Sequence, residues 1–509
     1  MQNSSATTKV LSANPGAYKP WWRMIAGHLG GVYPFYDTTD PNKFTLEISE
    51  IVHSREARGD QVQLDLTAIA SKATLPFLLG NRTLLKEVRR APWMALPGEN
   101  GEWEPEPLPL HGIASPDPEN FIQELHSALL EEARSYISES RTVGILLSGG
   151  MDSRVVAGIV RQIQQESDDA FDVVALTWGS ETSRDVVYAR RVADIFGWNS
   201  LHFPITAETL ASNISHMAKM GAEVSPLHLH AMPQIAALRG LDAVMAGSYG
   251  DSVGRGEFSG RKLVNLKDVL PKRLDRFGVL RHEAKKAAVS ALQLDVFDSP
   301  HLDMHTPSLR RHEIEQEMHY MRRMLQSCMC CIAQNKRIYQ LFTSPKVFGT
   351  MWGLDPNIRG DQWYARLIPL LPGELMEIPW ARTGLRYGEL HGQPDKFDSS
   401  HHTYGQWLRR DLRAEVFQRA NSDLIRNLGV FNDRGLDLAL RAWGRAETNS
   451  TNGLDELVSW LASLHEFIKQ FQLGTEGSGF STSPKDSWMA ISGNLYSKLY
   501  INARERLRD

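Results

Sequence analysis

Cysteine is scarce in this chain: its 509 residues contain three, Cys328, Cys330 and Cys331. None belongs to a C-x-x-C pair accompanied by a second pair or by spaced histidines, which argues against a zinc site. An odd number of closely spaced thiols offers no disulfide framework, as expected in a reducing compartment. We therefore interpret the three as reduced thiols on a helix that packs in the core.

Long apolar runs and an excess of either charge are also absent. No stretch reaches the roughly 18 apolar residues of a membrane span, and the start, MQNSSATTKV, lacks the apolar segment of a signal peptide. Lys and Arg number 56 against 60 Asp and Glu, a net charge of -4, so no basic excess indicates nucleic acid as a partner. We expect a cytoplasmic enzyme of two or three domains that binds neither a membrane nor nucleic acid.

The most informative stretch that is present is TVGILLSGGMDSRVVAGI, at 142–159. An apolar run ends abruptly in SGGMDS and a second one follows with helical spacing, the pattern of a buried strand, a tight turn and a helix. Adjacent glycines let an anion approach the backbone, and the helix N-terminus behind them suits a phosphate. Asp152 can hold a divalent cation, and Ser148 and Ser153 add hydroxyl donors. The turn contains no lysine, so it is not a Walker loop. The alternative to a phosphate-binding turn is an ordinary glycine turn after a buried strand.

Strands and helices alternate after this turn. The predicted strands are 173–178, 200–204 and 241–246, and the predicted helices are 183–196, 206–220 and 231–238. This pattern indicates an α/β fold, a parallel five-stranded-type sheet with helices on both faces. Ligands of such sheets collect beyond the carboxyl ends of the strands. Ser148, Trp178 and Gly247 each follow a predicted strand and should converge on one cleft.

Outside this region helical spacing dominates. The predicted helices are 62–79, 118–138, 312–338, 405–428, 433–443, 455–471 and the end of 481–509. We predict three parts: a truncated N-terminal region at 1–115, the α/β part with helical additions at 116–475, and a tail at 476–509, helical at its end.

A second glycine-rich loop, AGSYGDSVGRG at 246–256, carries one carboxylate, Asp251. A bound phosphate group needs charge neutralisation, commonly by magnesium held on one or two carboxylates and phosphate oxygens. Asp152 and Asp251 are the natural pair, because their strands should be neighbours in the sheet. The alternative is a surface turn with a turn-forming Asp.

These motifs resemble a known family. SGGMDS is similar to the pyrophosphate loop of the N-type ATP pyrophosphatases. Together with ALTWGSETSRDVVYARRVADIFG at 175–197 and the loop at 247–251, it makes roughly 120–470 resemble the synthetase domain of the asparagine synthetase family, which includes β-lactam synthetases and peptide-cyclising enzymes. The resemblance implies a fold like the adenine nucleotide alpha hydrolases. It also implies an ATP-dependent, AMP- and pyrophosphate-forming ligase that adenylates aspartate or a related acid for attack by ammonia or an amine, as in asparagine biosynthesis.

The resemblance also implies roles for matching positions. ATP would contact Leu147, Ser148, Gly149, Gly150, Asp152, Ser153, Leu176, Trp178, Gly247, Ser248 and Tyr249. Asp152 and Asp251 would hold Mg²⁺. In Pro379–Gly384, Arg382 stands where the family has a catalytic lysine, and it could stabilise charge on the phosphates with a fixed fork instead of a point charge. A salt bridge at the surface is the alternative for Arg382.

Other positions depart from the family pattern. Ser248 replaces the acid of the family's second loop, Tyr249 replaces its second glycine, and Ser344 replaces an Asp in RIYQLFTSP at 337–345. Glutamine-dependent members begin Met-Cys, whereas this chain begins Met1-Gln2, and only 78–96 resembles the end of a glutaminase domain. We predict no glutaminase activity of the chain's own, because no thiolate is available.

The partners we expect are therefore a small-molecule carboxylate and either ammonia or an amine, with a separate amidotransferase or pathway partner and a homodimer left open. Glu223, Tyr249 and His230 are candidate bases for the incoming amine, and the sequence does not rank them. Two alternatives remain. One is a related ATPase that modifies another acceptor, such as tRNA, and the other is a non-catalytic binding protein on the same fold.

Overall fold

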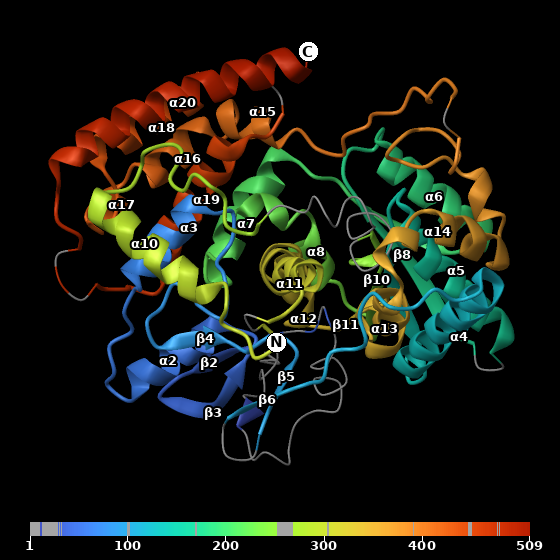
Figure 1. Cartoon of the computed structure of the whole chain (residues 1–509). Helices are drawn as coiled ribbons and strands as arrows, with labels where there is room; N and C mark the ends of the chain where they lie inside the picture. Colours follow the sequence, from blue (N-terminus) through green and yellow to red (C-terminus); the bar gives the residue numbers. More distant parts are fainter. Residues whose placement is uncertain are drawn as a thin grey trace, which may run out of the picture.

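A five-stranded parallel sheet forms the centre of one half of the molecule (Figure 1). The computed structural model describes residues 11–12, 29, 31, 33–98, 102–167, 170–251, 268–302, 305–389, 391–445, 450–475, 477 and 479–508. The strand order is β11-β10-β7-β8-β9, and every neighbouring pair is parallel. The strands are β7 (Thr142–Leu146), β8 (Asp172–Trp178), β9 (Asn199–Phe203), β10 (Ala243–Ala246) and β11 (Arg337–Gln340). The predicted fold class is confirmed.

Helices connect and cover these strands, as Figure 1 shows for α4, α5 and α6. They are α4 (Pro118–Ile137), α5 (Met151–Glu166), α6 (Arg184–Phe196), α7 (Ala207–Lys219), α8 (Met232–Ala236), α13 (Pro345–Gly353) and α14 (Gln362–Leu367). α5 buries Val155, Ile159 and Ile163, which are spaced by four residues and therefore share one face. α6 ends at Gly197, which takes the left-handed conformation that favours glycine at a helix end.

One sequence-based prediction fails at the edge of the sheet. The expected helix at 312–338 ends at Ala333, after α11 (Ser308–Glu315), the wide-turned η3 (Gln316–Leu325) and α12 (Gln326–Ala333). Arg337–Gln340 then forms β11 and pairs with β10. Four residues are too few to show a strand period, and the tertiary pairing overrides the local pattern. The three cysteines do lie on α12, as predicted, and burial raises the pKa of Cys328 to about 12.

The N-terminal region forms a small antiparallel sheet and two helices. The sheet contains β1 (Leu11–Ser12), β2 (Phe35–Asp37), β3 (Asp40–Thr45) and β4 (Val88–Arg90), and the helices are α2 (Ile48–Ala57) and α3 (Leu66–Thr74). β5 (Ala95–Pro97) pairs with β6 (Trp103–Pro105). α3 is shorter than the predicted 62–79, because Asp65 caps its start and Leu75 is extended.

The C-terminal helices occupy the other half of Figure 1. They are α15 (Tyr404–Arg409), α16 (Arg413–Ala420), α17 (Asp423–Arg426), α18 (Asp433–Trp443), α19 (Gly453–Gln470) and α20 (Pro484–Arg508), with α10 (His282–Asp295) beside them. The predicted helix at 405–428 is thus three short helices. Trp443 and Trp460 share a core with Phe35 and Ile51 of the N-terminal region, so these two distant segments pack together. Among the described helices, none combines the length and hydrophobicity that a membrane crossing requires.

Candidate active site

The SGGMDS turn lies between β7 and α5 and is shaped by its own serines. The N–H of Ser148 donates to Ser153 Oγ at 3.2 Å, and the N–H of Gly150 donates to Ser148 Oγ at 3.2 Å. α5 starts directly after Gly150, which has no side chain to cap the helix. α6, in contrast, is capped by the Ser183 hydroxyl. The positive end of α5 is therefore left without a side-chain cap, as in several other helices here such as α2 and α8, and its N–H groups can receive an anion.

A buried arginine, which sequence reasoning missed, fixes this turn to a distant segment. The Arg154 side chain donates to Gly149 O at 3.1 Å, to Ile378 O at 2.6 Å and to Pro379 O at 2.6 Å. The Ala381 N–H also donates to Gly149 O, at 3.1 Å. Burial lowers the pKa of Arg154 to about 10, so the guanidinium stays charged. The predicted basic-glycine segment at 379–384 therefore lies against the turn.

Arg382 is the exposed cation of that segment. Its guanidinium stands 5.5 Å from the centre of the Trp380 ring. Among the described residues no carboxylate forms a salt bridge with Arg382, so the alternative of a structural ion pair has no support in this part of the chain. This guanidinium lies over an aromatic ring close to the SGGMDS turn, and it is available to bind a ligand there.

The second loop contacts the first turn directly. A Cβ at Gly247 would stand 2.6 Å from the backbone carbon of Asp152 and 2.6 Å from the nitrogen of Ser153. At Gly250 it would stand 2.5 Å from Asp152 Oδ1. A side chain at Gly247 would collide with backbone, which cannot give way, whereas one at Gly250 would meet the side-chain ends of Asp152 and Tyr364. The carboxylate of Asp152 thus lies against the residue that precedes Asp251. The convergence predicted for these loops is present because β10 and β7 are parallel neighbours. Residues 252–256 of the predicted loop lie outside the described residues.

Tyr249 has a left-handed backbone conformation, with φ at 74°. Its side chain is buried in the main core beside Arg322 and Glu317, although its neighbours Ser248 and Gly250 belong to the loop. Burial raises the pKa of Tyr249 well above its ordinary value. The hydroxyl has no hydrogen-bond partner in the described structure. The structure therefore directs this side chain inward, behind the loop.

Arg322 is a second buried cation that the sequence did not reveal. Its Nη2 donates to Asn81 Oδ1 at 3.0 Å and to the carbonyl of Ala91. Its Nε and Nη1 are buried without a hydrogen-bond partner in the described part of the chain. Burial lowers the pKa of Arg322 to about 9. Buried donors left open are costly, so a guanidinium with two of them suits an anionic ligand group.

The other side chains proposed from sequence differ in whether they could reach a ligand. Glu223 is committed to two cations, at 2.9 Å from Arg90 and 3.2 Å from Arg323, which disfavours it as a base. Leu147 and Leu176 are fully buried, and the N–H of Leu147 donates to Leu176 O at 2.9 Å. Of the positions expected beside adenine on β8, Trp178 at the strand end keeps an exposed part.

Histidines gather beside the turn through Asp185, which lies in the first turn of α6. Asp185 Oδ1 accepts the N–H of Gly149 at 3.2 Å, and its Oδ2 lies 3.7 Å from His401 Nδ1. The ring of His401 lies 5.4 Å from that of His230 and 4.7 Å from that of His402. Burial lowers the pKa of all three imidazoles, that of His402 to about 4. Neutral imidazoles therefore border the turn.

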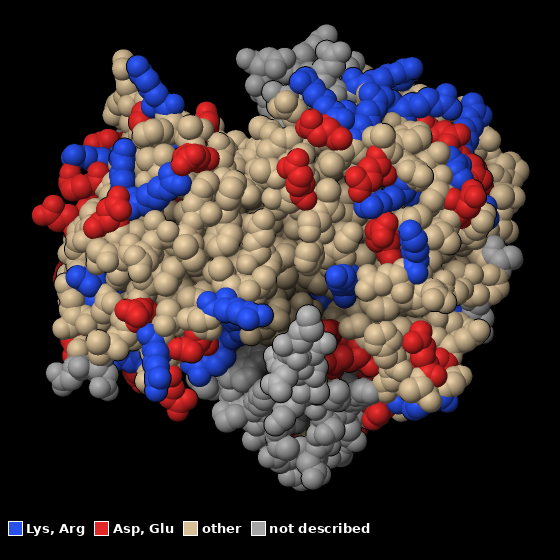
Figure 2. Space-filling view, turned by 180° about the vertical axis from the view of Figure 1, so that it is seen from behind, with Lys and Arg blue, Asp and Glu red and all other residues tan. Residues whose placement is uncertain are grey.

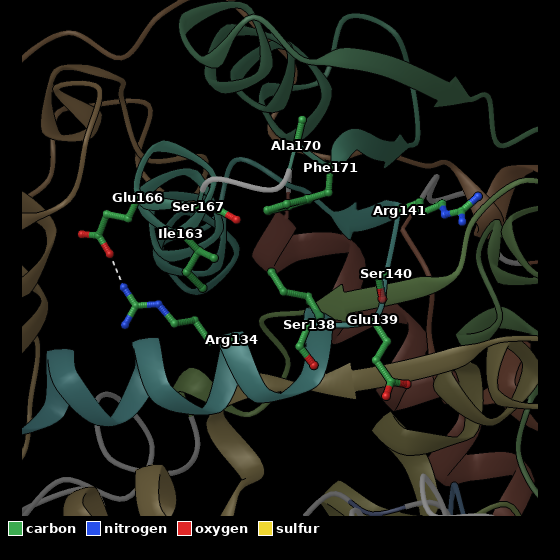
Figure 3. A pocket seen from close by; sticks show the side chains of 11 residues that line it. Arg134, Ser138, Glu139, Ser140, Arg141, Ile163, Glu166, Ser167, Ala170 and Phe171 are labelled. Atoms are coloured by element: carbon green, nitrogen blue, oxygen red, sulfur yellow. Dashed lines mark hydrogen bonds and ion pairs between the residues drawn. The ribbon is translucent and has the colours of Figure 1, made fainter.

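Two hollows of about 520 Å³ flank opposite ends of the sheet. The one in Figure 3 is lined by Arg134, Ser140 and Phe171 among others, which lie at the ends of α4 and α5 and before β7 and β8. It is thus at the amino ends of the strands, away from the turns. The other lies past the carboxyl ends of β8 and β9, with Gly179, His402 and Trp407 in its wall. Among the described residues no three His, Cys, Asp or Glu side chains form a complete metal site.

Comparison with protein families gives one match. Residues 124–337 match the family model described as asparagine synthase. This part of the chain, which is less than half of it, is therefore similar to an asparagine synthase domain. The matched part contains both turns, Asp152 and Asp251, whereas Arg382 lies beyond it. No curated protein matches the chain. The resemblance that the sequence motifs suggested is confirmed for the synthetase domain.

Proposed function

We propose that the asparagine synthase-like part of this chain is an AMP- and pyrophosphate-forming ligase that joins a carboxylate to an amine or ammonia. The observation that carries the proposal is the contact between the two turns. Gly247 and Gly250 bring the loop of Asp251 onto the backbone and carboxylate of Asp152, at the uncapped start of α5. In the proposal this contact brings backbone N–H groups, a helix N-terminus and the carboxylates of Asp152 and Asp251 together, as a metal-bound pyrophosphate requires.

The donor set fits Mg²⁺ with ATP. Two carboxylates, Asp152 and Asp251, supply hard oxygen ligands, and the phosphate oxygens of the nucleotide would complete the shell. When bound, the ion would neutralise the charge of the departing pyrophosphate. The start of α5 would hold the phosphates, and Arg382 would approach them from the segment that Ala381 fixes to Gly149. Catalysis by these residues would be mainly positioning and electrostatic stabilisation.

Arg322 and Tyr249 favour an acid with a further anionic group. Their open donors are buried directly behind the loop that carries Asp251. In the proposal one carboxylate of the substrate attacks the α-phosphate, while a second anionic group accepts hydrogen bonds from Arg322. The free protein already bears the cost of burying these N–H groups without acceptors. Binding of the substrate would relieve this cost, because its anionic group would accept their hydrogen bonds.

The amine must lose a proton before or during its attack. Of the three bases considered from sequence, Glu223, Tyr249 and His230, the contacts in the structure disfavour two. Glu223 is held between two arginines, and the raised pKa of Tyr249 keeps its hydroxyl protonated. His230 remains, with His401 beside it; the lowered pKa of each imidazole keeps it neutral, although it also makes each a weaker base. His401 lies closer to the turn because Asp185 links it to Gly149.

The test is the fate of ATP. The protein is incubated with Mg²⁺, ATP, hydroxylamine as the amine, and aspartate or other carboxylic acids in turn, and AMP, ADP and pyrophosphate are measured. The proposal expects AMP and pyrophosphate in equal amounts. Asp152→Asn should lower the rate by about 10²–10³-fold, whereas Asp172→Asn, at the opposite end of the sheet, should not. ADP release, or ATP binding without cleavage with any acid, would contradict the proposal.

A further inference from the structure

The outer face of α20 carries an apolar stripe with no cover in the described structure. Trp488, Ile491, Leu495 and Leu499 are 71%, 52%, 60% and 61% exposed. Their spacing of three, four and four residues places them on one side of the helix. At about 1.5 Å per residue the stripe is about 16 Å long. Exposed apolar side chains are common singly, but an aligned set on one helix marks an interaction site.

The inner side of α20 is attached to the body of the protein by close packing and hydrogen bonds. Gly493 packs against the backbone carbonyl of Phe277, where even a Cβ would collide. Asp486 accepts the N–H of His282 at 2.7 Å, and its carbonyl accepts from Asn432 at 2.6 Å. Figure 1 shows α20 lying along α18 at the rim of the molecule. The inner face is thus occupied, and the outer face is presented in a fixed orientation.

The surroundings of the stripe are basic. α20 and α10 enclose a groove of about 710 Å³ beside Trp488, whose wall includes Lys285, Lys286 and Lys485. Glu283 pairs with Lys286 at 3.0 Å and offsets one of these three charges. Lys498 is exposed next to Leu499. Figure 2 shows Lys and Arg side chains gathered along the upper edge, on the side where the C-terminal helices lie. From 487 to 503 the sequence of α20 contains no acidic residue.

We propose that this face of α20 and its groove dock an acidic amphipathic helix of a partner protein. Apolar anchors at helical spacing suit a helix laid against the stripe, with one anchor in the groove. The lysines on both sides complement flanking Asp or Glu residues of the partner. The concave groove beside Trp488 favours a protein side chain over a flat lipid surface. This site is remote from the two turns and does not depend on the proposed ligase activity.

The test uses the full chain and a fluorescently labelled synthetic helix of about 18 residues, with Leu at helical spacing and Glu on the flanks. Fluorescence anisotropy should show saturable binding. Leu495→Glu should weaken it at least about tenfold, and the double variant Lys485→Glu, Lys498→Glu at least about fivefold, with a matching loss at high salt. Leu110→Glu, at a leucine that is 74% exposed and lies far from α20 in sequence, should leave binding unchanged. Circular dichroism checks that each variant folds.

Other results would overturn the proposal. Absence of binding would refute it, as would equal binding of a peptide with Lys in place of Glu, because the charge complementarity would then be irrelevant. Sedimentation that shows dimers dissolved by Leu495→Glu would assign the face to a second copy of the chain. Binding to phosphatidylglycerol vesicles but not to the peptide would assign it to a lipid surface.

Discussion

Replacement of Gly247 by alanine is the most direct way to separate the two turns. The new Cβ would stand 2.6 Å from two backbone atoms of the first turn of α5, the carbon of Asp152 and the nitrogen of Ser153. An ordinary contact requires 3.4 Å, so the loop and the helix must move apart by 0.8 Å. Both sides are backbone, which cannot rotate away. Overpacking of this kind costs about 1–3 kcal/mol, and misplacement of reacting groups by about 1 Å costs about 10²-fold in rate.

The assay has two readouts, the urea unfolding curve and the affinity for ATP with Mg²⁺. Gly247→Ala should lower the unfolding free energy by about 1–3 kcal/mol and weaken ATP binding. Gly474→Ala is the matched control, because its Cβ would meet nothing within 4 Å. If Gly247→Ala unfolds and binds ATP like the wild type, the loops are not in the contact described and the reasoning fails.

Three further predictions concern single side chains. Arg382→Ala should lower ATP cleavage by about 10²–10³-fold and Arg382→Lys by less, whereas equal rates for all three proteins would remove this residue from the site. Tyr249→Phe should leave the free energy of unfolding in urea within about 1 kcal/mol of the wild type while raising the KM for the acid; an unchanged KM would contradict the acid-binding role. The imidazole of His319 is buried and accepts the N–H of Gly80 at 3.1 Å, and burial lowers its pKa to about 3. Because the unfolded chain binds this proton near pH 6.5 and the folded chain only near pH 3, stability should fall as pH drops between these values, by about 1.4 kcal/mol per unit. His319→Gln should flatten this part of the urea stability profile, and an unchanged slope would contradict the assignment.

The sheet and its two turns could be predicted from sequence because the signals there are local. The abrupt change from an apolar run to SGGMDS marks β7 and α5, and parallel neighbours place Gly247 on the same edge. The resemblance also led to the segment of Arg382, which no local pattern in 379–384 would have placed beside the turn. The contact of this segment with Gly149 depends on Arg154. The hydrophobic periodicity of the sequence gives no sign that this arginine is buried.

Several features escaped prediction because distant segments create them. β11 exists through its pairing with β10, and four residues give no reliable period. Arg322 looks like one of many surface charges on a helix, and its importance follows only from burial beside Tyr249. Asp185 likewise gained a role through contacts with both Gly149 and His401. The predicted limits of the three parts of the chain stay a prediction.

The most direct test of the central claim is a double-mutant cycle on Asp152 and Asp251, read out as the calorimetric affinity for ATP with and without Mg²⁺. If both carboxylates hold one ion on the leaving pyrophosphate, each change to Asn should weaken the magnesium-dependent part of binding. The double variant should then be little weaker than either single one, since the shared ion is already lost. Strictly additive losses, or losses that persist without Mg²⁺, would show that the two carboxylates do not meet over the same ion and would contradict the account.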